Sequence, residues 1–287
     1  MIAITGGTGF VGRRLAARLL QAGEQVRALA RHPAHLPEVT VAQADVTGSP
    51  DSLADLLAGC QAVIHLVGII RERGGETFHR VHVRGTENVI RACKEAGVPR
   101  LLHMSALGAR SDARSRYHRS KWKAEELVRA SGLAATIFRP SVIFGPGSAF
   151  LSQMRALVTG PPVIPIVGNG MSLLQPIWIE DVATCFLAAL GNDQTIGHSY
   201  ELGGPETYGF EQLLDLIAES AGIEKPKLHL PVWLVRLAAT ALSPLSARFP
   251  LTADQLALLL EDNVCDITET RETFGLAPAS LRAHLSE

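Results

Sequence analysis

Two side chains that could move a proton together, those of Tyr117 and Lys121, lie four residues apart. In a helix this spacing puts both side chains on one face. A tyrosine hydroxyl titrates at about pH 10, and a nearby ammonium favours the phenolate and lowers its pKa. The pair therefore predicts a general acid or base that serves a carbonyl or alcohol oxygen. The same pair would also suit a protein that clamps a cofactor without turnover.

Three glycines near the start of the chain, Gly6, Gly9 and Gly12, follow an apolar run that predicts a strand. They belong to the sequence Thr-Gly-Gly-Thr-Gly-Phe-Val-Gly of residues 5–12, which leads into a predicted helix. Glycines let the backbone approach a pyrophosphate, and the helix start offers free N–H groups and the positive end of its dipole. This strand–turn–helix context predicts a dinucleotide site. The alternative is a tight turn that binds no ligand.

The residues after the second predicted strand favour NADP(H) over NAD(H). An acidic residue at the end of that strand would bind the adenosine ribose hydroxyls and repel a 2′-phosphate. Here the position is Ala30, and Arg31 follows it. Arginine makes charge-assisted hydrogen bonds to phosphate, so Arg31 is expected to bind the 2′-phosphate; a solvated loop arginine is the alternative. Asp45 is expected either to contact the adenine or to stabilise a turn.

The other predicted cofactor contacts lie at strand ends or on the helix that carries the tyrosine and the lysine. A small residue at the end of the fourth strand would leave room for the cofactor, and Lys121 could hold the nicotinamide ribose. The set predicted from these arguments is Gly6, Thr8, Gly9, Phe10, Val11, Gly12, Arg31, Asp45, Val46, Val67, Gly68 and Lys121.

The elements that must position these residues alternate along the chain. Apolar runs predict strands near the start and at 26–30, 39–42, 62–66, 101–104 and 135–138, with helical segments between them. Such alternation predicts an α/β fold with a doubly wound parallel sheet of the Rossmann type. We expect a nucleotide-binding domain over 1–145, with contributions from about 160–200, and a smaller C-terminal lobe for a substrate or partner over 146–287.

Composition narrows the class of protein. The chain has 287 residues, 47% of them hydrophobic, and 27 basic against 28 acidic side chains leave a net charge of −1. This balance gives no electrostatic case for binding nucleic acid. The four cysteines are scattered without metal-ligand spacing, so no metal site is predicted, and they suit reduced core positions of a cytoplasmic protein. No signal segment is predicted, because the first apolar residues already form a strand.

One apolar stretch could contact a membrane or a partner. It extends from Leu228 to Leu245 and is interrupted by Pro231, Arg236 and Pro244, so it is too broken to span a bilayer. Burial as a core helix is favoured over a position on a membrane surface.

The motifs together resemble the short-chain dehydrogenase/reductase superfamily, in its extended and atypical branches, which include sugar-nucleotide epimerases. A finer similarity is to the atypical subgroup that contains the nucleotide-binding accessory subunit of respiratory complex I. The superfamily resemblance rests on the glycine motif, Tyr117-x-x-x-Lys121 and residues 139–146 and 175–183, and the finer one on residues 104–109, 203–206, 251–256 and 261–264.

The resemblance implies further site residues and exposes two departures. In relatives the Arg-Pro loop passes the nicotinamide, so Pro140 is expected to line the site. Active relatives add a serine or threonine that hydrogen-bonds the substrate oxygen; Ser105 is the candidate, although the counted position is nearer Leu107. The asparagine that organises a proton relay in relatives is replaced by His82. The cofactor site therefore looks complete, whereas the catalytic set is depleted.

Two functions remain open. The first is an NADP(H)-dependent oxidoreductase or epimerase for an unknown carbonyl or alcohol substrate, with Tyr117, Lys121 and Ser105 as catalytic residues. The second is a non-catalytic nucleotide-binding accessory or assembly protein of a complex I-like or quinone-related membrane complex. We expect a cytoplasmic protein in the first case and one peripheral to the inner membrane in the second.

Overall fold

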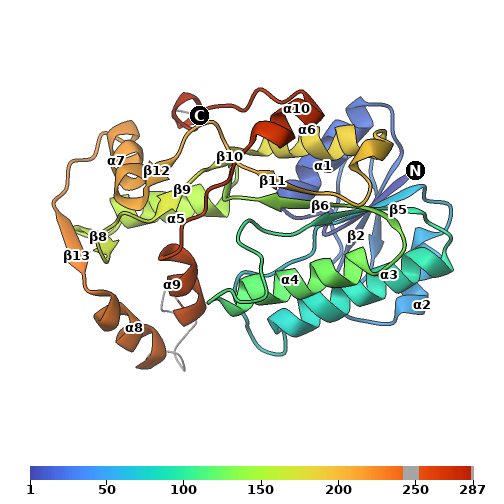
Figure 1. Ribbon diagram of the computed structural model, residues 1–287, viewed down its shortest axis with the longest axis horizontal. Helices are drawn as coiled ribbons and strands as arrows, with labels where there is room; N and C mark the ends of the chain where they lie inside the picture. The colour runs from blue at the N-terminus through green and yellow to red at the C-terminus, as the bar shows by residue number, and fades with distance from the viewer. Residues whose placement is uncertain (242–251, 286–287) are drawn as a thin grey trace. The chain divides into compact units, whose positions relative to one another are not determined.

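A computed structural model describes residues 1–241 and 252–285, which form two units (Figure 1). The first unit contains Met1–Pro140, Ile179–Leu202 and Ile267–Ala277. The second contains the described residues of Ser141–Trp178, Gly203–Asp266 and Pro278–Glu287. The chain therefore returns to the first unit twice after it has left it.

The first unit is built on a seven-stranded sheet in the order β11-β6-β5-β4-β1-β2-β3, with parallel pairing throughout. The predicted doubly wound fold is thus confirmed. Strand order reverses beside β1, and in such sheets ligands bind outside the carboxyl ends of the strands at this point. The strands are β1 (Ile2–Thr5), β2 (Val26–Ala30), β3 (Thr40–Gln43), β4 (Ala62–His65), β5 (Arg100–Met104), β6 (Ala134–Pro140) and β11 (Ser199–Leu202).

Helices cover both faces of this sheet. In Figure 1, α2, α3 and α4 lie on one face and α1 and α6 on the other. One of the helical segments expected between the strands buries an apolar stripe that includes Phe78, Val81, Val89 and Cys93. The helical segments are α1 (Phe10–Gln21), α2 (Pro50–Leu57), the π-helix η1 (His79–Arg84), α3 (Gly85–Glu95), α4 (Arg116–Arg129), α6 (Ile179–Leu190), η2 (Asp193–Thr195) and α10 (Thr268–Phe274).

The second unit combines three two-stranded sheets with short helices around a core that includes Phe144, Phe210 and Leu213. The strand pairs are β7 (Ile143–Phe144) with β10 (Ile177–Trp178), β9 (Leu173–Leu174) with β12 (Tyr208–Gly209), and β8 (Ile164–Val167) with β13 (Lys227–Leu230). The helices are α5 (Ala149–Thr159), α7 (Phe210–Ser220), α8 (Val232–Ala241), α9 (Ala253–Leu259) and η4 (Arg282–His284).

The expectation that the apolar stretch from Leu228 is buried is wrong for much of its described part. Residues 242–245 lie outside the described residues, and the rest forms β13 and the short helix α8. Only one face of α8, with Val235, is buried, whereas Trp233 is 67% exposed and Leu237 58% exposed. A helix packed on one side leaves its other side to solvent, however apolar its residues are. Within 1–241 and 252–285, no helix is both long and apolar enough to cross a membrane.

Candidate cofactor and catalytic site

The glycine loop joins β1 to α1 at the carboxyl edge of the sheet. Gly6 has a φ of 74°, which side chains rarely allow. A Cβ on Gly12 would lie 2.3 Å from the Gly6 carbonyl oxygen, so only glycine lets the helix approach the loop this closely. The N-cap of α1 is Gly9, without a side-chain hydrogen bond, and the first turn contains no acidic residue. The first N–H groups of α1 therefore suit an anionic ligand.

A cavity of about 250 Å³ adjoins this loop and collects most of the predicted cofactor contacts. Phe10, Val11 and Gly12 lie in the first turn of α1, and Pro140 is the last residue of β6. Asp45 accepts hydrogen bonds from the N–H and the hydroxyl of Thr47, at 2.8 and 2.9 Å, so it also stabilises a turn. The predicted residues that line the cavity are Gly6, Thr8, Gly9, Arg31, Asp45, Val46, Val67 and Gly68.

Arg31 lines this cavity with an exposed guanidinium that forms an ion pair with Glu76. The arginine therefore lies on the cavity wall, and its contact with a phosphate stays a prediction. Sequence reasoning missed its acidic partner, which comes from the segment between β4 and η1.

Lys121 is buried in the middle of α4, and its Nζ donates a hydrogen bond of 2.7 Å to the Met104 carbonyl oxygen. Burial lowers the pKa of Lys121 to about 8, and the Glu125 carboxylate opposes that shift. The helix begins after Ser115, whose Oγ accepts the His118 N–H at 2.9 Å. The lysine remains mostly protonated at neutral pH.

Tyr117 lies one turn before Lys121, at the start of α4. Its ring packs edge-on against Phe78 and His82, with centroids 5.9 and 5.5 Å away. Burial raises the pKa of the hydroxyl to about 12, so the predicted lowering by Lys121 is wrong for this structure. Loss of water around the phenolate disfavours the ionised form and is the cause of this shift.

His82 connects the end of β4 to α4 through a chain of hydrogen bonds. Its Nε2 accepts the Ile69 N–H at 2.9 Å, and its Nδ1 lies 2.7 Å from the Ser120 hydroxyl. Ser120 in turn donates to the Tyr117 carbonyl oxygen at 2.6 Å. Since Nε2 accepts, Nδ1 must carry the proton and donate to Ser120. Burial lowers the pKa of His82 to about 2, which keeps the ring neutral.

Gly68 lies between the cavity and the Lys121 side chain of α4. It lines the cavity, and a Cβ placed on it would lie 3.4 Å from His82 Nε2 and 3.7 Å from Lys121 Nζ. A side chain here would fill the space between the cavity and the lysine. The prediction that a small residue follows the fourth strand thus has a geometric reason.

Ser105 and Leu107 both lie in the buried loop after β5. Their backbone N–H groups donate to the carbonyl oxygens of Phe138 and Pro140, at 2.7 and 2.9 Å. Among the described residues, the Ser105 hydroxyl finds no hydrogen-bond partner although it is shielded from solvent. The loop therefore fastens to β6 through its backbone, and the Ser105 hydroxyl takes no part in that attachment.

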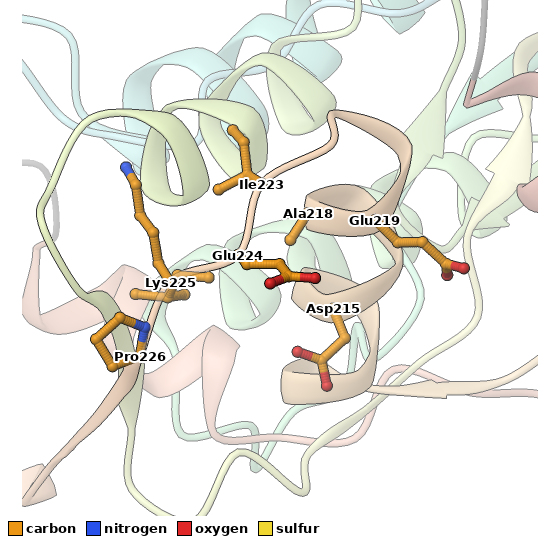
Figure 2. A pocket seen from close by; sticks show the side chains of 8 residues that line it. Asp215, Ala218, Glu219, Ile223, Glu224, Lys225 and Pro226 are labelled. Atoms are coloured by element: carbon orange, nitrogen blue, oxygen red, sulfur yellow. The ribbon is translucent and has the colours of Figure 1, made fainter.

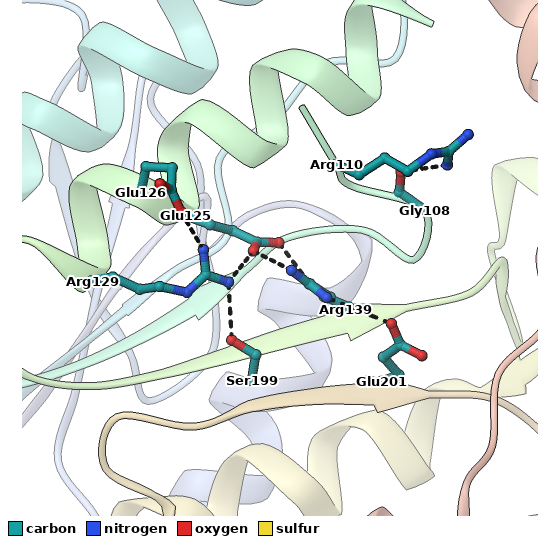
Figure 3. A network of polar contacts seen from close by, with 8 residues as sticks. All are labelled: Gly108, Arg110, Glu125, Glu126, Arg129, Arg139, Ser199 and Glu201. Carbon is teal, nitrogen blue, oxygen red and sulfur yellow. Dashed lines mark hydrogen bonds and ion pairs between the residues drawn. The ribbon is translucent and has the colours of Figure 1, made fainter. Parts of the chain in front are cut away.

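A buried carboxylate that sequence reasoning missed fixes α4 to β6 (Figure 3). Glu125 has no exposed surface and accepts two hydrogen bonds from Arg139, at 2.9 and 2.6 Å. Arg129 donates a third, of 2.5 Å. Because Arg139 precedes Pro140, the network holds the end of β6 beside the lysine helix. The available signals were the spacing of Glu125, four residues after Lys121, and the Arg-Pro pair.

Two further histidines are buried at the ends of neighbouring strands. His65 ends β4 and bonds the hydroxyls of Thr5 and Thr86, at 2.6 and 3.1 Å. His103 lies next to His65 in the register of β4 and β5. Neither ring nitrogen of His103 has a hydrogen-bond partner among the described residues. Burial lowers the pKa of His65 to about 3, so this ring is neutral in the folded chain.

A second cavity, of about 520 Å³, lies in the second unit beside α7 (Figure 2). Its walls include the carboxylates of Asp215, Glu219 and Glu224 and contain none of the predicted site residues. Lys225 points away from them and donates to the carbonyl oxygens of Thr159 and Pro161. No group of three metal-ligating side chains occurs among the residues that the structure describes.

The family is decided by a match that covers most of the chain. Residues 2–203 match the model of the NAD dependent epimerase/dehydratase family. The chain belongs to this family. This confirms the resemblance to the extended short-chain dehydrogenases, and the family name assigns a nicotinamide dinucleotide as the cofactor.

Individual relatives span reductases and a respiratory subunit. A ceramide reductase of Caulobacter vibrioides is 36% identical over 66% of this chain, and the match spans only 60% of that protein. Subunit 9 of the mitochondrial NADH dehydrogenase [ubiquinone] 1 alpha subcomplex of Arabidopsis thaliana is 29% identical over 98% of this chain and 75% of its own length. The predicted similarity to such subunits is confirmed.

A solved structure supports the fold. The UDP-glucuronic acid 4-epimerase of Bacillus cereus, in complex with UDP-glucuronic acid and NAD, has a TM-score of 0.75 to this chain. The two share 19% identity, and the alignment covers 99% of this chain and 96% of the epimerase.

Proposed function

We propose that this protein is an NADP(H)-dependent oxidoreductase or epimerase that acts on a carbonyl or alcohol group of a small substrate. The observation that carries the proposal is the place of Gly68, which lines the cavity beside the glycine loop and adjoins Lys121 Nζ. The lysine, and the tyrosine one turn before it, thus belong to the same site as the dinucleotide cavity.

Each part of the dinucleotide has residues suited to it. The glycine loop and the N-terminus of α1 would hold the pyrophosphate, and Arg31 would hold the 2′-phosphate. Asp45 and Val46 would border the adenine, and Val67, Gly68, Lys121 and Pro140 the nicotinamide and its ribose. When bound, the nicotinamide ring supplies or accepts the hydride.

The protein's own residues would move the proton. With its pKa raised to about 12, Tyr117 keeps its proton at neutral pH and can donate it to a reduced carbonyl oxygen. The Lys121 ammonium would stabilise the phenolate that remains. Ser105 would hydrogen-bond the substrate oxygen through its unpartnered hydroxyl.

The catalytic proposal is tested by following NADPH oxidation over a panel of carbonyl substrates. Tyr117→Phe removes the proton donor, so turnover should fall about 10²- to 10⁴-fold while NADPH still binds. Tyr200→Phe is the control, because Tyr200 packs in the core with Phe138 and Phe274 and should leave turnover unchanged. Equal turnover in both variants would remove Tyr117 from the mechanism.

Cofactor preference is tested by measuring dissociation constants for NADPH and NADH. We expect tighter binding of NADPH, and at least about tenfold weaker NADPH binding in Arg31→Glu, because a charge-assisted contact becomes a repulsion. Arg91→Glu is the control. Arg91 is also an exposed arginine in an ion pair, but it lies on α3 and pairs with Asp51 of α2. Equal affinities that Arg31→Glu leaves unchanged would overturn the NADP(H) preference.

A second candidate is a nucleotide-binding accessory protein of a membrane complex. Two observations favour it: the Arabidopsis relative named as a subunit of NADH dehydrogenase, and the exposed apolar side chains of Trp233, Leu234 and Leu237 on α8. In that case the dinucleotide would stay bound without turnover. Purification from the native host would then recover membrane-complex subunits, and the protein would lie at the inner membrane instead of free in the cytoplasm.

A further inference from the structure

The ion pair between Arg31 and Glu76 lies where the proposed function needs a free guanidinium. Arg31 lines the dinucleotide cavity directly after β2, and Glu76 approaches it from the segment between β4 and η1. Both side chains are partly exposed, at 46% and 37%, so the carboxylate and a ligand phosphate would compete for Arg31 in a solvated setting.

The backbone around Glu76 presents its carboxylate at this place. Arg73 and Glu76 exchange two backbone hydrogen bonds, of 3.2 and 3.0 Å, which close a tight turn over Gly74 and Gly75. Gly74 has a φ of 56°, as a hairpin turn of this kind requires. A carboxylate on a closed turn is held near Arg31 more firmly than one on an open loop.

The other end of the same segment is anchored beside the catalytic helix. Glu72 accepts the Phe78 N–H at 2.8 Å, and its second oxygen pairs with Arg116 at 2.8 Å. Arg116 is the first residue of α4 and precedes Tyr117. Residues 70–78 therefore extend from the arginine at the adenosine end to the start of the helix that carries the proposed proton donor.

We propose that Glu76 is a specificity-determining residue, whose carboxylate competes with the 2′-phosphate of NADP(H) for Arg31 and so limits the preference for NADP(H) over NAD(H). This inference rests on the proposed dinucleotide site. A 2′-phosphate must displace Glu76 from Arg31, and the displaced carboxylate then repels the phosphate. NAD(H) has no charge at this position, so it leaves the pair intact.

The size of the effect follows from the solvated setting. Charges about 4–6 Å apart in water-like surroundings interact weakly, so removing one carboxylate should change NADPH affinity by about 3- to 10-fold. The gain should shrink as salt rises, because salt screens exposed charges.

The test is the substitution Glu76→Gln, with dissociation constants for NADPH and NADH measured by fluorescence titration of the full chain. NADPH should bind about 3- to 10-fold more tightly and NADH within about twofold of the unchanged protein. Glu76→Gln should likewise tighten binding of the fragment 2′,5′-ADP but not of 5′-AMP. The affinity gain would then be located at the 2′-phosphate of the ribose. Asp51→Asn is the matched control, because it also removes the carboxylate of an exposed arginine pair, that with Arg91.

The inference is overturned if Glu76→Gln leaves the ratio of NADPH affinity to NADH affinity unchanged, or if Asp51→Asn shifts that ratio equally. In an Arg31→Gln background the gain in NADPH affinity from Glu76→Gln should become smaller, and an undiminished gain would show that Glu76 does not act through Arg31.

If Arg31→Gln itself leaves NADPH binding unchanged, the NADP(H) preference fails. If Arg31→Gln weakens NADPH binding while Glu76→Gln has no effect, only the present inference fails. Binding of neither dinucleotide would overturn both.

Discussion

The carboxyl edge of the seven-stranded sheet is built in two different ways along its length. At the glycine end, residues 6–12 and the adjoining cavity present backbone N–H groups and an exposed arginine. At the lysine end, comprising His82, Ser120, Lys121 and Glu125, the polar groups are buried and bond to other segments. The α1 N-terminus has no side-chain cap, whereas the polar side chains of the lysine end are joined to one another and to neighbouring segments.

The two helices that start at this edge show the same difference. The N-terminus of α1 has Gly9 as N-cap and no side-chain bond, whereas Ser115 caps α4 with its hydroxyl. Changes at the lysine end should therefore lower stability and turnover more than dinucleotide affinity. Changes at the glycine end should lower dinucleotide affinity more than stability or turnover.

The largest effect is expected from Glu125→Ala at the lysine end. It leaves Arg139 and Arg129 without their buried partner, so the free energy of unfolding should fall by about 3–5 kcal/mol. Glu126→Ala is the control: Glu126 pairs with Arg129 at the surface and should cost less than about 1 kcal/mol. Urea unfolding of both variants measures the difference, and equal losses would show that the lysine end is not specially fixed.

The second effect concerns pH. The folded-state pKa values of His65 and His82 lie at about 3 and about 2, below the ordinary 6.5, so the unfolded chain binds protons that the folded chain does not. Stability is fully present above about pH 6.5 and should fall as pH decreases, by about 1.4 kcal/mol per pH unit for each histidine between about pH 6 and pH 3.

Urea unfolding at pH 7, 6 and 5 measures this slope. In His82→Asn the loss of stability between pH 7 and pH 5 should be smaller by about 2 kcal/mol, because one buried neutral ring is gone and the unfolded histidine takes up its proton within this range. His32→Asn is the control, since His32 is exposed and its loss should leave the slope unchanged. A slope that responds equally to both substitutions would contradict the distinction between buried and exposed rings.

The smallest effect tests the two kinds of helix start. Ser115→Ala removes the bond to the His118 N–H and should lower the free energy of unfolding by about 1 kcal/mol, with NADPH affinity nearly unchanged. Ser49→Ala is matched to it, because Ser49 is the N-cap of α2 but makes no side-chain cap bond. Thermal or urea unfolding compares them, and a larger loss in Ser49→Ala would argue against the capping role.

Much of the glycine end was predictable because it lies in short segments. The spacing of Gly6, Gly9 and Gly12 after a strand is a local pattern, and the order of strands and helices implied the parallel sheet that the structure has. The predicted places of Arg31 and Asp45 at strand ends put both on the cavity wall. Their roles toward a bound dinucleotide stay predictions.

The lysine end was predictable only in part. The four-residue spacing of Tyr117 and Lys121 sufficed to place them one turn apart on α4. The predicted direction of the pKa shift of Tyr117 was wrong. The pKa is raised because the ring is buried, and that burial depends on Phe78 and His82, which come from another segment. The pairing of Glu125 with Arg139 likewise joins α4 to β6. The spacing of Glu125 after Lys121 puts it on the same helix face, but it does not say which distant residue the carboxylate pairs with.

Residue order along the chain was enough to determine the family, the α/β class, the glycine loop and the helix face shared by Tyr117 and Lys121, because each depends on neighbours within a few residues. Folding was needed to decide that His82 is neutral, that Glu76 reaches Arg31, and that α8 exposes Trp233. Burial and ion pairing depend on which distant segments meet, and that is decided by the packing of helices, strands and loops within each unit.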